Sequence, residues 1–205
     1  MSKLSRLLLA LASGLLLVAL ALPLWRVRLV APQYPEGLGM EIRANTVRGA
    51  TEHDLQSINS LNHYIGMKTI EPDEIPDLRV VPWIFGGLAV LGLVAVVVGR
   101  RPVAIAWLGA FVAAGIAGLW DFYRWEYEYG HDLDLAHAII KVPGMSYQPP
   151  LIGSKQLLNF VATSWPASGT LVLGAAFLLG LAAVLLRTPR APHPTVGTRT
   201  LEQAA

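Results

Sequence analysis

Methionine and histidine are the side chains of this sequence best suited to holding a metal ion. Each methionine after the initiator follows a glycine, and these methionines are Met40, Met67 and Met145. A thioether is a soft ligand that suits Cu(I), and imidazole binds copper in either oxidation state. His63 precedes Met67 by four residues, so one helical turn would bring both toward one ion. The spacing therefore predicts copper binding through a methionine and histidine site.

Further candidate ligands lie in a later part of the chain. His137 and Met145 would complete the site from there, and Met40 and His131 are additional candidates. A simpler interpretation is also open, because methionine commonly fills irregular gaps in protein cores. A histidine in a small folded cap is often a structural residue whose hydrogen bonds are satisfied. The sequence leaves both interpretations open, since it contains no His-x-His pair and no dense methionine cluster.

Enzymatic chemistry has weaker support in the sequence. The chain has no cysteine, which excludes disulfides, thiolate zinc sites, iron–sulfur clusters and cysteine nucleophiles. The acidic residues between 121 and 134 are interpreted as a solvated face, and no nucleophile elbow, phosphate loop or dinucleotide fingerprint occurs. We therefore expect a protein that is not an enzyme. A membrane metalloenzyme that uses His63, His131 and His137 is the remaining catalytic alternative.

Four apolar stretches are long enough to cross a membrane as helices. The composition is 54% hydrophobic and 15% charged, whereas about 25% of the residues in soluble domains are charged. A helix needs about 20 mostly apolar residues to cross the hydrocarbon core, and uncharged runs of that length satisfy their own backbone in lipid. The stretches are Leu7–Leu24, Trp83–Gly99, Pro102–Trp120 and Ala167–Leu186. Because they hold no ionisable side chain, a transporter or proton pump is not indicated.

Charge and tryptophan positions orient these helices. With the N-terminus inside, the cytoplasmic segments hold seven Lys and Arg residues and one acid, whereas 13 of the 14 acids fall in two outer loops. Positive charge in short cytoplasmic flanks is the positive-inside pattern. Tryptophan favours the headgroup layer, and one stands at the predicted outer end of each span: Trp25, Trp83, Trp120 and Trp165. We therefore predict a multi-pass protein of a bacterial inner membrane with both termini in the cytoplasm.

The first outer loop has strand-like and helical patterns. Residues 26–30 and 40–44 alternate in polarity and predict strands, separated by a turn at residues 35–37. A helix is predicted over Glu52–Ile65, where Leu55, Ile58 and Leu61 recur on one face. Thr51 and Asp54 resemble a capping box at its start, and Gly66 is placed to end it.

The second outer loop begins with an aromatic and acidic run. This run, from Asp121 to Tyr129, is predicted to prolong the third helix beyond the bilayer. Short helices are predicted over Asp134–Lys141 and Lys155–Ala162, the latter lying on the membrane surface. We expect the two loops to pack on each other as one ordered cap.

The predicted fold is an all-α membrane protein with four transmembrane helices and a small α+β extracytoplasmic cap formed by the two loops. The first span is interpreted as an uncleaved signal anchor. The predicted segments are a cytoplasmic N-terminus with the first transmembrane helix (1–24), a first loop (25–82), a transmembrane hairpin (83–120), a second loop (121–166), a fourth transmembrane helix (167–186) and a cytoplasmic tail (187–205).

Three long strings of the chain resemble a group of small membrane proteins associated with bacterial nitrous oxide reductase gene clusters. The strings are residues 58–67 (INSLNHYIGM), 121–131 (DFYRWEYEYGH) and 142–150 (VPGMSYQPP), and the resemblance covers roughly Tyr34 to Phe160. It implies an accessory role in maturing a periplasmic multicopper enzyme or supplying it with metal, and it names no ligand residue. The chain lacks the cysteine-containing lipobox of the lipoprotein copper chaperones found in the same clusters.

The predicted function is therefore that of a membrane accessory protein whose Met/His cap assists copper supply or maturation of a periplasmic copper enzyme such as nitrous oxide reductase. Its expected partners are membrane lipid and a periplasmic or membrane protein. Nucleic acid is excluded, because the net charge is only +2 and no basic run appears. The alternative is a non-catalytic structural or docking subunit of a larger membrane complex, with the run from Asp121 as its docking face.

Overall fold

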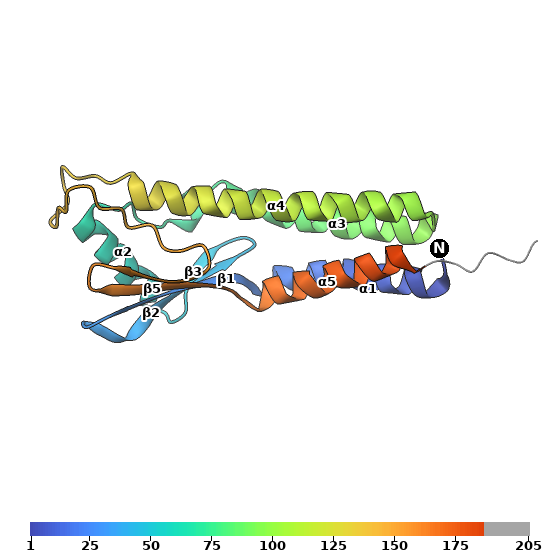
Figure 1. Cartoon of the computed structure of the whole chain (residues 1–205), viewed down its shortest axis with the longest axis horizontal. Helices are drawn as coiled ribbons and strands as arrows, with labels where there is room; N and C mark the ends of the chain where they lie inside the picture. The colour runs from blue at the N-terminus through green and yellow to red at the C-terminus, as the bar shows by residue number, and fades with distance from the viewer. Residues whose placement is uncertain (187–205) are drawn as a thin grey trace, which may run out of the picture.

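The computed structural model describes residues 1–186, so the predicted tail 187–205 lies outside the described residues. Within the described part, four helices are long and apolar enough to cross a membrane. They are α1 (Lys3–Leu20), α3 (Asp77–Val98), α4 (Arg101–His131) and α5 (Ser168–Leu185). The helices form one half of an elongated molecule, and a small sheet with helix α2 forms the other half (Figure 1). This arrangement confirms four long apolar helices and a small cap that contains a sheet, which is the architecture expected of a helical membrane protein.

One end of the bundle brings together the N-terminus, the turn between α3 and α4, and the end of α5. The amino group of Met1 donates to Gly99 O at 2.8 Å, and Arg101 Nε donates to Val184 O at 3.1 Å. Gly99 has a φ of +66°, a left-handed conformation that costs glycine nothing. The turn makes α3 and α4 antiparallel neighbours, as the sequence predicts.

The first helix lies closer to the N-terminus than predicted. The expected span Leu7–Leu24 included two residues that belong to strand β1 (Pro23–Ala31), because α1 ends at Leu20. Proline has no amide hydrogen to continue a helical ladder, and β1 pairs with a neighbour along each edge. Only Ala21 and Leu22 therefore separate the helix from the strand.

Helix α4 continues well past the predicted outer end of its span at Trp120. It runs to His131, which confirms the expectation that the aromatic and acidic run prolongs the third transmembrane helix. We take residues 102–120 as the membrane-spanning part, since the first charged side chain after Pro102 is Asp121. The part from 121 to 131 belongs to the cap.

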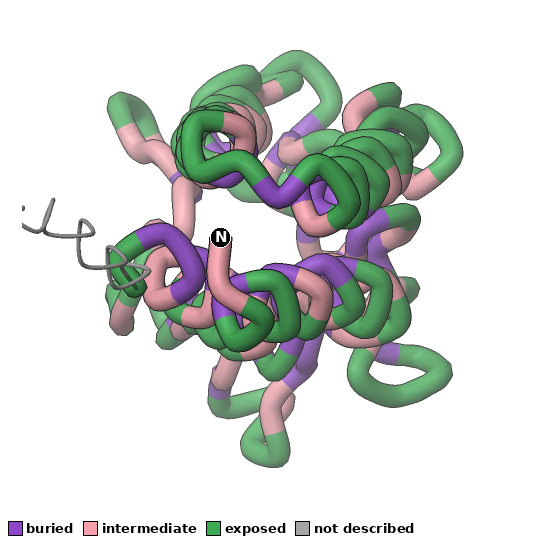
Figure 2. Tube along the Cα trace, turned by 90° about the vertical axis from the view of Figure 1, so that its right-hand side faces the viewer, coloured by how far each residue is buried: buried purple, intermediate pink, exposed green. Residues whose placement is uncertain are grey.

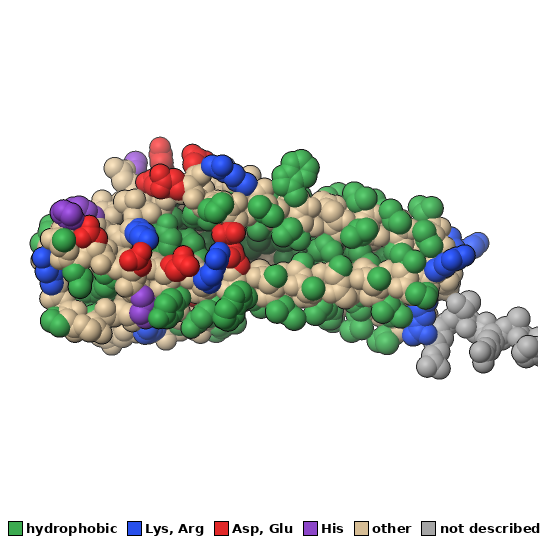
Figure 3. All heavy atoms as spheres, turned by 90° about the horizontal axis from the view of Figure 1, so that it is seen from above, with side chains coloured by type: hydrophobic (Ala, Val, Ile, Leu, Met, Phe, Trp, Pro, Cys, Tyr) green, Lys and Arg blue, Asp and Glu red, His purple; other side chains and the backbone are tan. Residues whose placement is uncertain are grey.

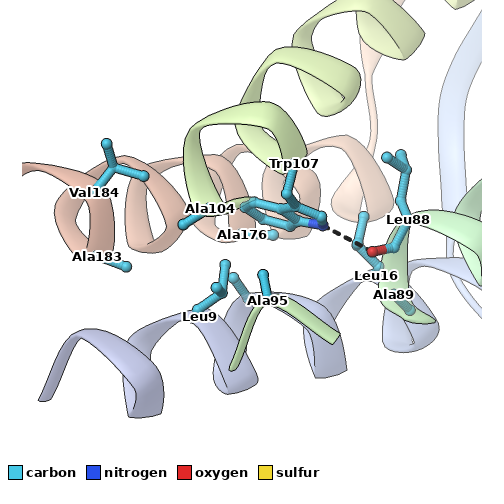
Figure 4. Packing of buried hydrophobic residues seen from close by; sticks show 11 residues of the cluster. Leu9, Leu16, Leu88, Ala89, Ala95, Ala104, Trp107, Ala176, Ala183 and Val184 are labelled. Atoms are coloured by element: carbon cyan, nitrogen blue, oxygen red, sulfur yellow. Dashed lines mark hydrogen bonds between the residues drawn. The ribbon is translucent and has the colours of Figure 1, made fainter. Parts of the chain in front are cut away.

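Trp107 of α4 fills the centre of the bundle (Figure 4). It is 2% exposed, and its Nε1 donates to Leu88 O of α3 at 2.7 Å. A side chain at Gly180 of α5 would come within 2.4 Å of the indole ring. Small residues at such contacts let helix backbones approach closely, and many buried positions around the ring are small: Ala12, Ala89, Ala95, Ala104, Ala176 and Ala183.

The outward surface of the bundle is apolar. In the view along its axis, exposed positions dominate the outer sides of the helices (Figure 2). Large exposed side chains there include Val97, at 81%, and Leu171, at 70%. On the face drawn in Figure 3, hydrophobic side chains cover the bundle, and charged ones gather at its far end and over the cap. Such an uncharged band between two charged regions suits lipid.

The cap is built on one antiparallel sheet to which both loops contribute, with the strand order β3-β2-β1-β5-β4. The first loop supplies β1, β2 (Tyr34–Arg43) and β3 (Val47–Gly49), and the second supplies β4 (Gly153–Leu157) and β5 (Phe160–Pro166). The central pairing of β1 with β5 joins the two loops, which confirms that they form one unit. The strands continue directly from α1 and into α5 (Figure 1).

Trp25 shows how tightly the two loops are joined near the membrane. It is 6% exposed, and its Nε1 donates to the buried Ser164 Oγ at 2.7 Å. The expectation that Trp25 lies in the headgroup layer is therefore wrong, because the ring is part of the cap core. The other three outer tryptophans are exposed, with Trp83 at 81%, Trp120 at 67% and Trp165 at 56%.

Helix α2 (Asp54–Ile65) covers part of the sheet and matches its prediction closely. Asp54 accepts a hydrogen bond from Gly39 N at 2.8 Å, which ties the start of α2 to β2. Ile58 is 4% exposed, and Leu55 and Leu61 are partly buried against the same core. Gly66 ends the helix with a φ of +77°, as predicted. A short 3₁₀ turn, η1 (Pro72–Glu74), then leads back toward α3.

Two predicted helices of the second loop are wrong. Residues 155–162 form the β4–β5 hairpin, because β5 completes the free edge of β1 and strand pairing outweighs local helical propensity. Residues 134–141 form turns and bends instead of a helix. Pro143 and Gly144, which follow shortly after, both disfavour a helix. The turn expected at residues 35–37 lies instead at residues 32 and 33, so Pro35 is inside β2.

Candidate functional site

The candidate ligands His63 and Met67 lie at the end of α2, where a segment of the second loop crosses it. Asp134 N donates to Gly66 O at 2.8 Å, and the amides of Ile139 and Ile140 both donate to Tyr64 O, at 3.0 and 2.8 Å. Gly66 permits this crossing, because a side chain on it would come within 2.7 Å of Asp134 O. The backbone contacts therefore hold the second loop against the C-terminal turn of α2.

A groove of about 430 Å³, which we call the α2 groove, lies where these two segments meet. Three of the predicted ligands line it, namely His63, Met67 and His137. The remaining lining residues are Gly66, Lys68, Thr69, Asp132, Leu133, Asp134 and Ala138. Residues from both loops therefore share one depression on the outside of the cap.

Several polar and charged side chains of the α2 groove already form hydrogen bonds or ion pairs with one another. His137 Nδ1 lies 2.7 Å from Asp134 Oδ2, and this hydrogen bond holds the pKa of the Asp134 carboxyl below its usual value. A carboxylate on Nδ1 leaves Nε2 of a neutral imidazole free to bind a metal ion. Lys68 pairs with Asp132 across the groove. His137 is 81% exposed, so its ring is accessible from solvent.

The other predicted ligands lie elsewhere. Met40 is 5% exposed in the cap core on β2. The His131 ring stacks on Tyr127 with centroids 4.0 Å apart, and its Nδ1 lies 3.0 Å from Tyr127 O. Met145 lines neither the α2 groove nor the cavity described below. Within residues 1–186, no group of three or more His, Cys, Asp or Glu side chains is placed to hold a metal ion.

A second hollow, which we call the cap cavity, has a volume of about 320 Å³ and lies between the sheet, α2 and the outer part of α4. Its wall is almost entirely apolar, with side chains from four sources. The sheet contributes Val27, Leu29, Met40 and Leu157; α2 contributes Ile58, Leu61 and Ile65; α4 contributes Trp125 and Tyr129; and the second loop contributes Ile140, Tyr147 and Pro149. A cavity of this size is within the range of small-molecule sites, about 300 to 1,000 Å³.

Among the residues that the structure describes, Glu126 is the one carboxyl group that lines the cap cavity. It is 1% exposed, and neither of its oxygens has a hydrogen-bond partner. Burial raises the pKa of this carboxyl to about 8, so the group is mostly neutral at pH 7 and able to donate one hydrogen bond. The hydroxyl of Tyr147, 4% exposed, also lines the cavity without a partner.

A close backbone approach positions Tyr147 against α4. Tyr147 N donates to Gly130 O at 2.9 Å. A side chain on Gly130 would come within 2.4 Å of the backbone of Gln148, so only glycine allows the extended segment to lie so near the helix. Tyr147 and Pro149 of this extended segment also line the cap cavity.

Sequence reasoning placed Glu126 on a solvated acidic face, and this placement is wrong. The signal that would have found it is its helical spacing: Phe122, Glu126 and Tyr129 lie at i, i+4 and i+7, on one face of α4. Phe122 and Tyr129 both pack against the cap core. A charged residue between two core aromatic residues is buried with them.

No family model matches this chain, and no curated protein sequence matches it either.

Proposed function

We propose that this protein is a membrane accessory protein whose cap binds copper in the α2 groove and delivers it to a periplasmic copper enzyme such as nitrous oxide reductase. The observation that carries the proposal is that His63, Met67 and His137 line the same groove, although they come from different loops. The resemblance of residues 58–67, 121–131 and 142–150 to membrane proteins of nitrous oxide reductase gene clusters supports the same enzyme as recipient.

The donor set of the α2 groove suits Cu(I) better than harder metal ions. Two imidazoles and one thioether offer soft and intermediate ligands, whereas Mg²⁺ and Ca²⁺ require oxygen ligands. The carboxylates of the groove are occupied, since Asp132 pairs with Lys68 and Asp134 with His137. An exposed site with few ligands binds an ion that is to be passed on, rather than one that is held permanently.

Titration with Cu(I) against a competing chelator tests this proposal on the full-length protein. The double change His63→Ala and Met67→Ala removes two of the three donors and should weaken binding at least about tenfold, or about 1.4 kcal/mol. Met145→Ala and His131→Ala are matched controls, because these side chains lie outside the α2 groove, and they should leave the affinity unchanged. An unchanged affinity in the double variant contradicts the proposal.

The orientation of the membrane protein is part of the proposal, since copper delivery to a periplasmic enzyme requires an extracytoplasmic cap. The chain has no cysteine, so a single introduced thiol reports its own side of the membrane. Cysteine at Ser154, exposed in the cap, should react with an impermeant thiol reagent added outside cells with a permeable outer barrier. Cysteine at Lys3, at the other end of the bundle, should not. Labelling at the Lys3 position but not at the Ser154 position would show that the orientation is the reverse of the one proposed.

A second candidate function is that of a docking subunit, favoured by the exposed aromatic side chains on the outer part of α4. Tyr123 is 40% exposed and Tyr127 is 48% exposed, next to Asp121 and Glu128 on the same helix. Aromatic residues are enriched at protein interfaces. The test is co-purification with a second membrane protein. A partner that co-purifies with the wild type but not with Tyr123→Ala, from a protein that binds no copper, favours this function over copper binding.

A further inference from the structure

The cap cavity opens at the end of the molecule that is farthest from the bundle. Three side chains of its wall are partly exposed there, with Tyr64 at 47%, Ile140 at 46% and Leu158 at 36%. The β1–β2 turn and the β4–β5 turn also reach this end (Figure 1), and Asn159 Nδ2 of one turn donates to Gln33 Oε1 of the other at 3.4 Å. The opening therefore faces the aqueous side, away from the bilayer.

The wall of the cap cavity combines a large apolar surface with a few polar groups, and this combination favours one class of ligand. Apolar side chains from the sheet, α2 and α4 form nearly all of it, whereas Trp125, Glu126 and Tyr147 contribute polar groups without partners. A buried polar group without a hydrogen bond costs about 1 to 3 kcal/mol, and such groups are rare in native proteins. Three residues with such groups line one cavity, which indicates that a bound molecule supplies a partner for at least some of them.

We propose that the cap cavity binds a small neutral amphipathic molecule, with an apolar body against the sheet and α2 and one oxygen acceptor hydrogen-bonded to Glu126 and Tyr147. Alcohols, esters and ketones with a medium-length hydrocarbon chain have this chemistry. A carboxyl in its neutral form and a phenol are both donors, so an acceptor oxygen satisfies both. The inference does not rest on the copper proposal, although Met67 lines both the cap cavity and the α2 groove.

Photolabelling of the full-length protein in lipid nanodiscs tests the inference. The probe is a medium-chain alcohol that carries a diazirine, and mass spectrometry maps the labelled peptides. Label on α1, α3 and α5 reports partition of the probe into lipid and serves as the internal reference. Label on the cap peptides around Ile58, Trp125 and Tyr147 reports the cap cavity, and excess unlabelled alcohol should compete it away.

Variants separate binding in the cavity from labelling of an exposed surface. Leu61→Trp fills the cavity and should abolish the competable cap label, whereas Ser60→Trp, on the exposed side of α2, should retain it. Tyr147→Phe keeps the packing and removes one donor, and Glu126→Leu removes the other; each should weaken competition by the alcohol about three- to tenfold, the effect of one hydrogen bond.

Three results overturn the inference. They are the absence of competable cap label in the wild type, an equal label in Leu61→Trp and Ser60→Trp, and competition by an apolar peptide but not by the alcohol. If Leu61→Trp loses its fold, the comparison of Tyr147→Phe with the wild type decides, because an unchanged competition constant in that variant excludes the proposed hydrogen bond.

Discussion

The transmembrane core and the cap core satisfy their polar groups to different degrees. In the bundle, Ser13 donates to Leu9 O at 2.8 Å and Trp107 donates to Leu88 O at 2.7 Å. In the cap, several buried side chains have polar atoms without a hydrogen bond. Among the described residues, every buried side-chain polar atom without a hydrogen bond is in the cap: Arg43 Nε, Trp125 Nε1, both Glu126 carboxyl oxygens and Tyr147 OH.

This difference indicates where the protein acts. Inside lipid no water is present to form a hydrogen bond with an unsatisfied polar group. The bundle is accordingly packed with small and apolar residues, and it serves as an anchor. Unsatisfied groups beside a cavity lower the stability of the cap, and proteins keep such groups mainly at functional sites. The bundle therefore positions the cap, and the cap contains both candidate sites.

Removing the central side chain of the bundle should have the largest effect. Trp107→Ala should lower the free energy of unfolding by about 3 to 5 kcal/mol, because it leaves a large cavity and strands Leu88 O. Trp83→Ala is the matched control, since Trp83 is 81% exposed, and it should cost no more than about 0.5 kcal/mol. Denaturant unfolding in detergent measures both. Equal losses would show that the bundle core is not centred on Trp107.

The cap should be sensitive to pH in a way that the bundle is not. Because burial raises the Glu126 pKa to about 8, the folded protein binds one more proton than the unfolded chain between the unfolded pKa and that value. Stability is thus greatest below the unfolded pKa and falls as pH rises toward the folded one, by at most about 1.4 kcal/mol per pH unit. Two buried tyrosines of the cavity wall, Tyr129 and Tyr147, do not titrate in this window, since burial raises their pKa values too.

Glu126→Gln provides the control for that pH dependence. Glutamine has nearly the same shape and does not titrate, so the slope of unfolding free energy against pH between about pH 5 and pH 8 should flatten. Thermal unfolding in the same detergent at several pH values measures it. A slope that is identical in the variant and the wild type would assign the pH dependence to other groups.

A single methyl group added at Gly66, in the turn beside the α2 groove, should lower the stability of the protein. Gly66→Ala forces a left-handed φ of +77° on alanine and places its Cβ within 2.7 Å of Asp134 O, which should cost about 2 kcal/mol in total. Gly86→Ala in α3 meets no atom within 4 Å and should gain up to about 1 kcal/mol from helix propensity. If both variants are equally stable, the crossing of Asp134 over Gly66 is absent in solution.

The exposed ion pair of the groove should matter least for stability. Lys68 and Asp132 have side chains that are 58% and 68% exposed, and such pairs contribute about 0.2 to 1 kcal/mol. Lys68→Ala should therefore change the unfolding free energy by less than about 1 kcal/mol. The same change removes a positive charge beside His63 and Met67, so it should strengthen Cu(I) binding. Weaker binding in Lys68→Ala would place the ion outside the α2 groove.

The membrane-spanning half of the fold could be predicted because its determinants are local. An uncharged run of sufficient length must be helical in lipid, whichever neighbours it acquires. The same holds for the end of α2, where the glycine at position 66 terminates a periodic helix. The boundary of α1 was missed by four residues, from Leu24 to Leu20, because apolar composition alone does not distinguish the end of a helix from the start of a strand.

The sequence by itself determined that four segments are apolar and long enough to cross a membrane, that most charge lies outside them and that the candidate metal ligands fall in the two long loops. Only the tertiary structure decided that residues 155–162 are strands, since their partner β1 is more than a hundred residues earlier in the chain. It also decided that His63, Met67 and His137 line one groove, which Met40, His131 and Met145 do not line. The burial of Glu126 depends likewise on the sheet and α2, which close over one face of α4. Strand pairing depends on segments that meet only in the folded protein, so it leaves no local pattern in the sequence. The helical spacing of Phe122, Glu126 and Tyr129 does indicate a common face, but only the folded cap shows what covers that face.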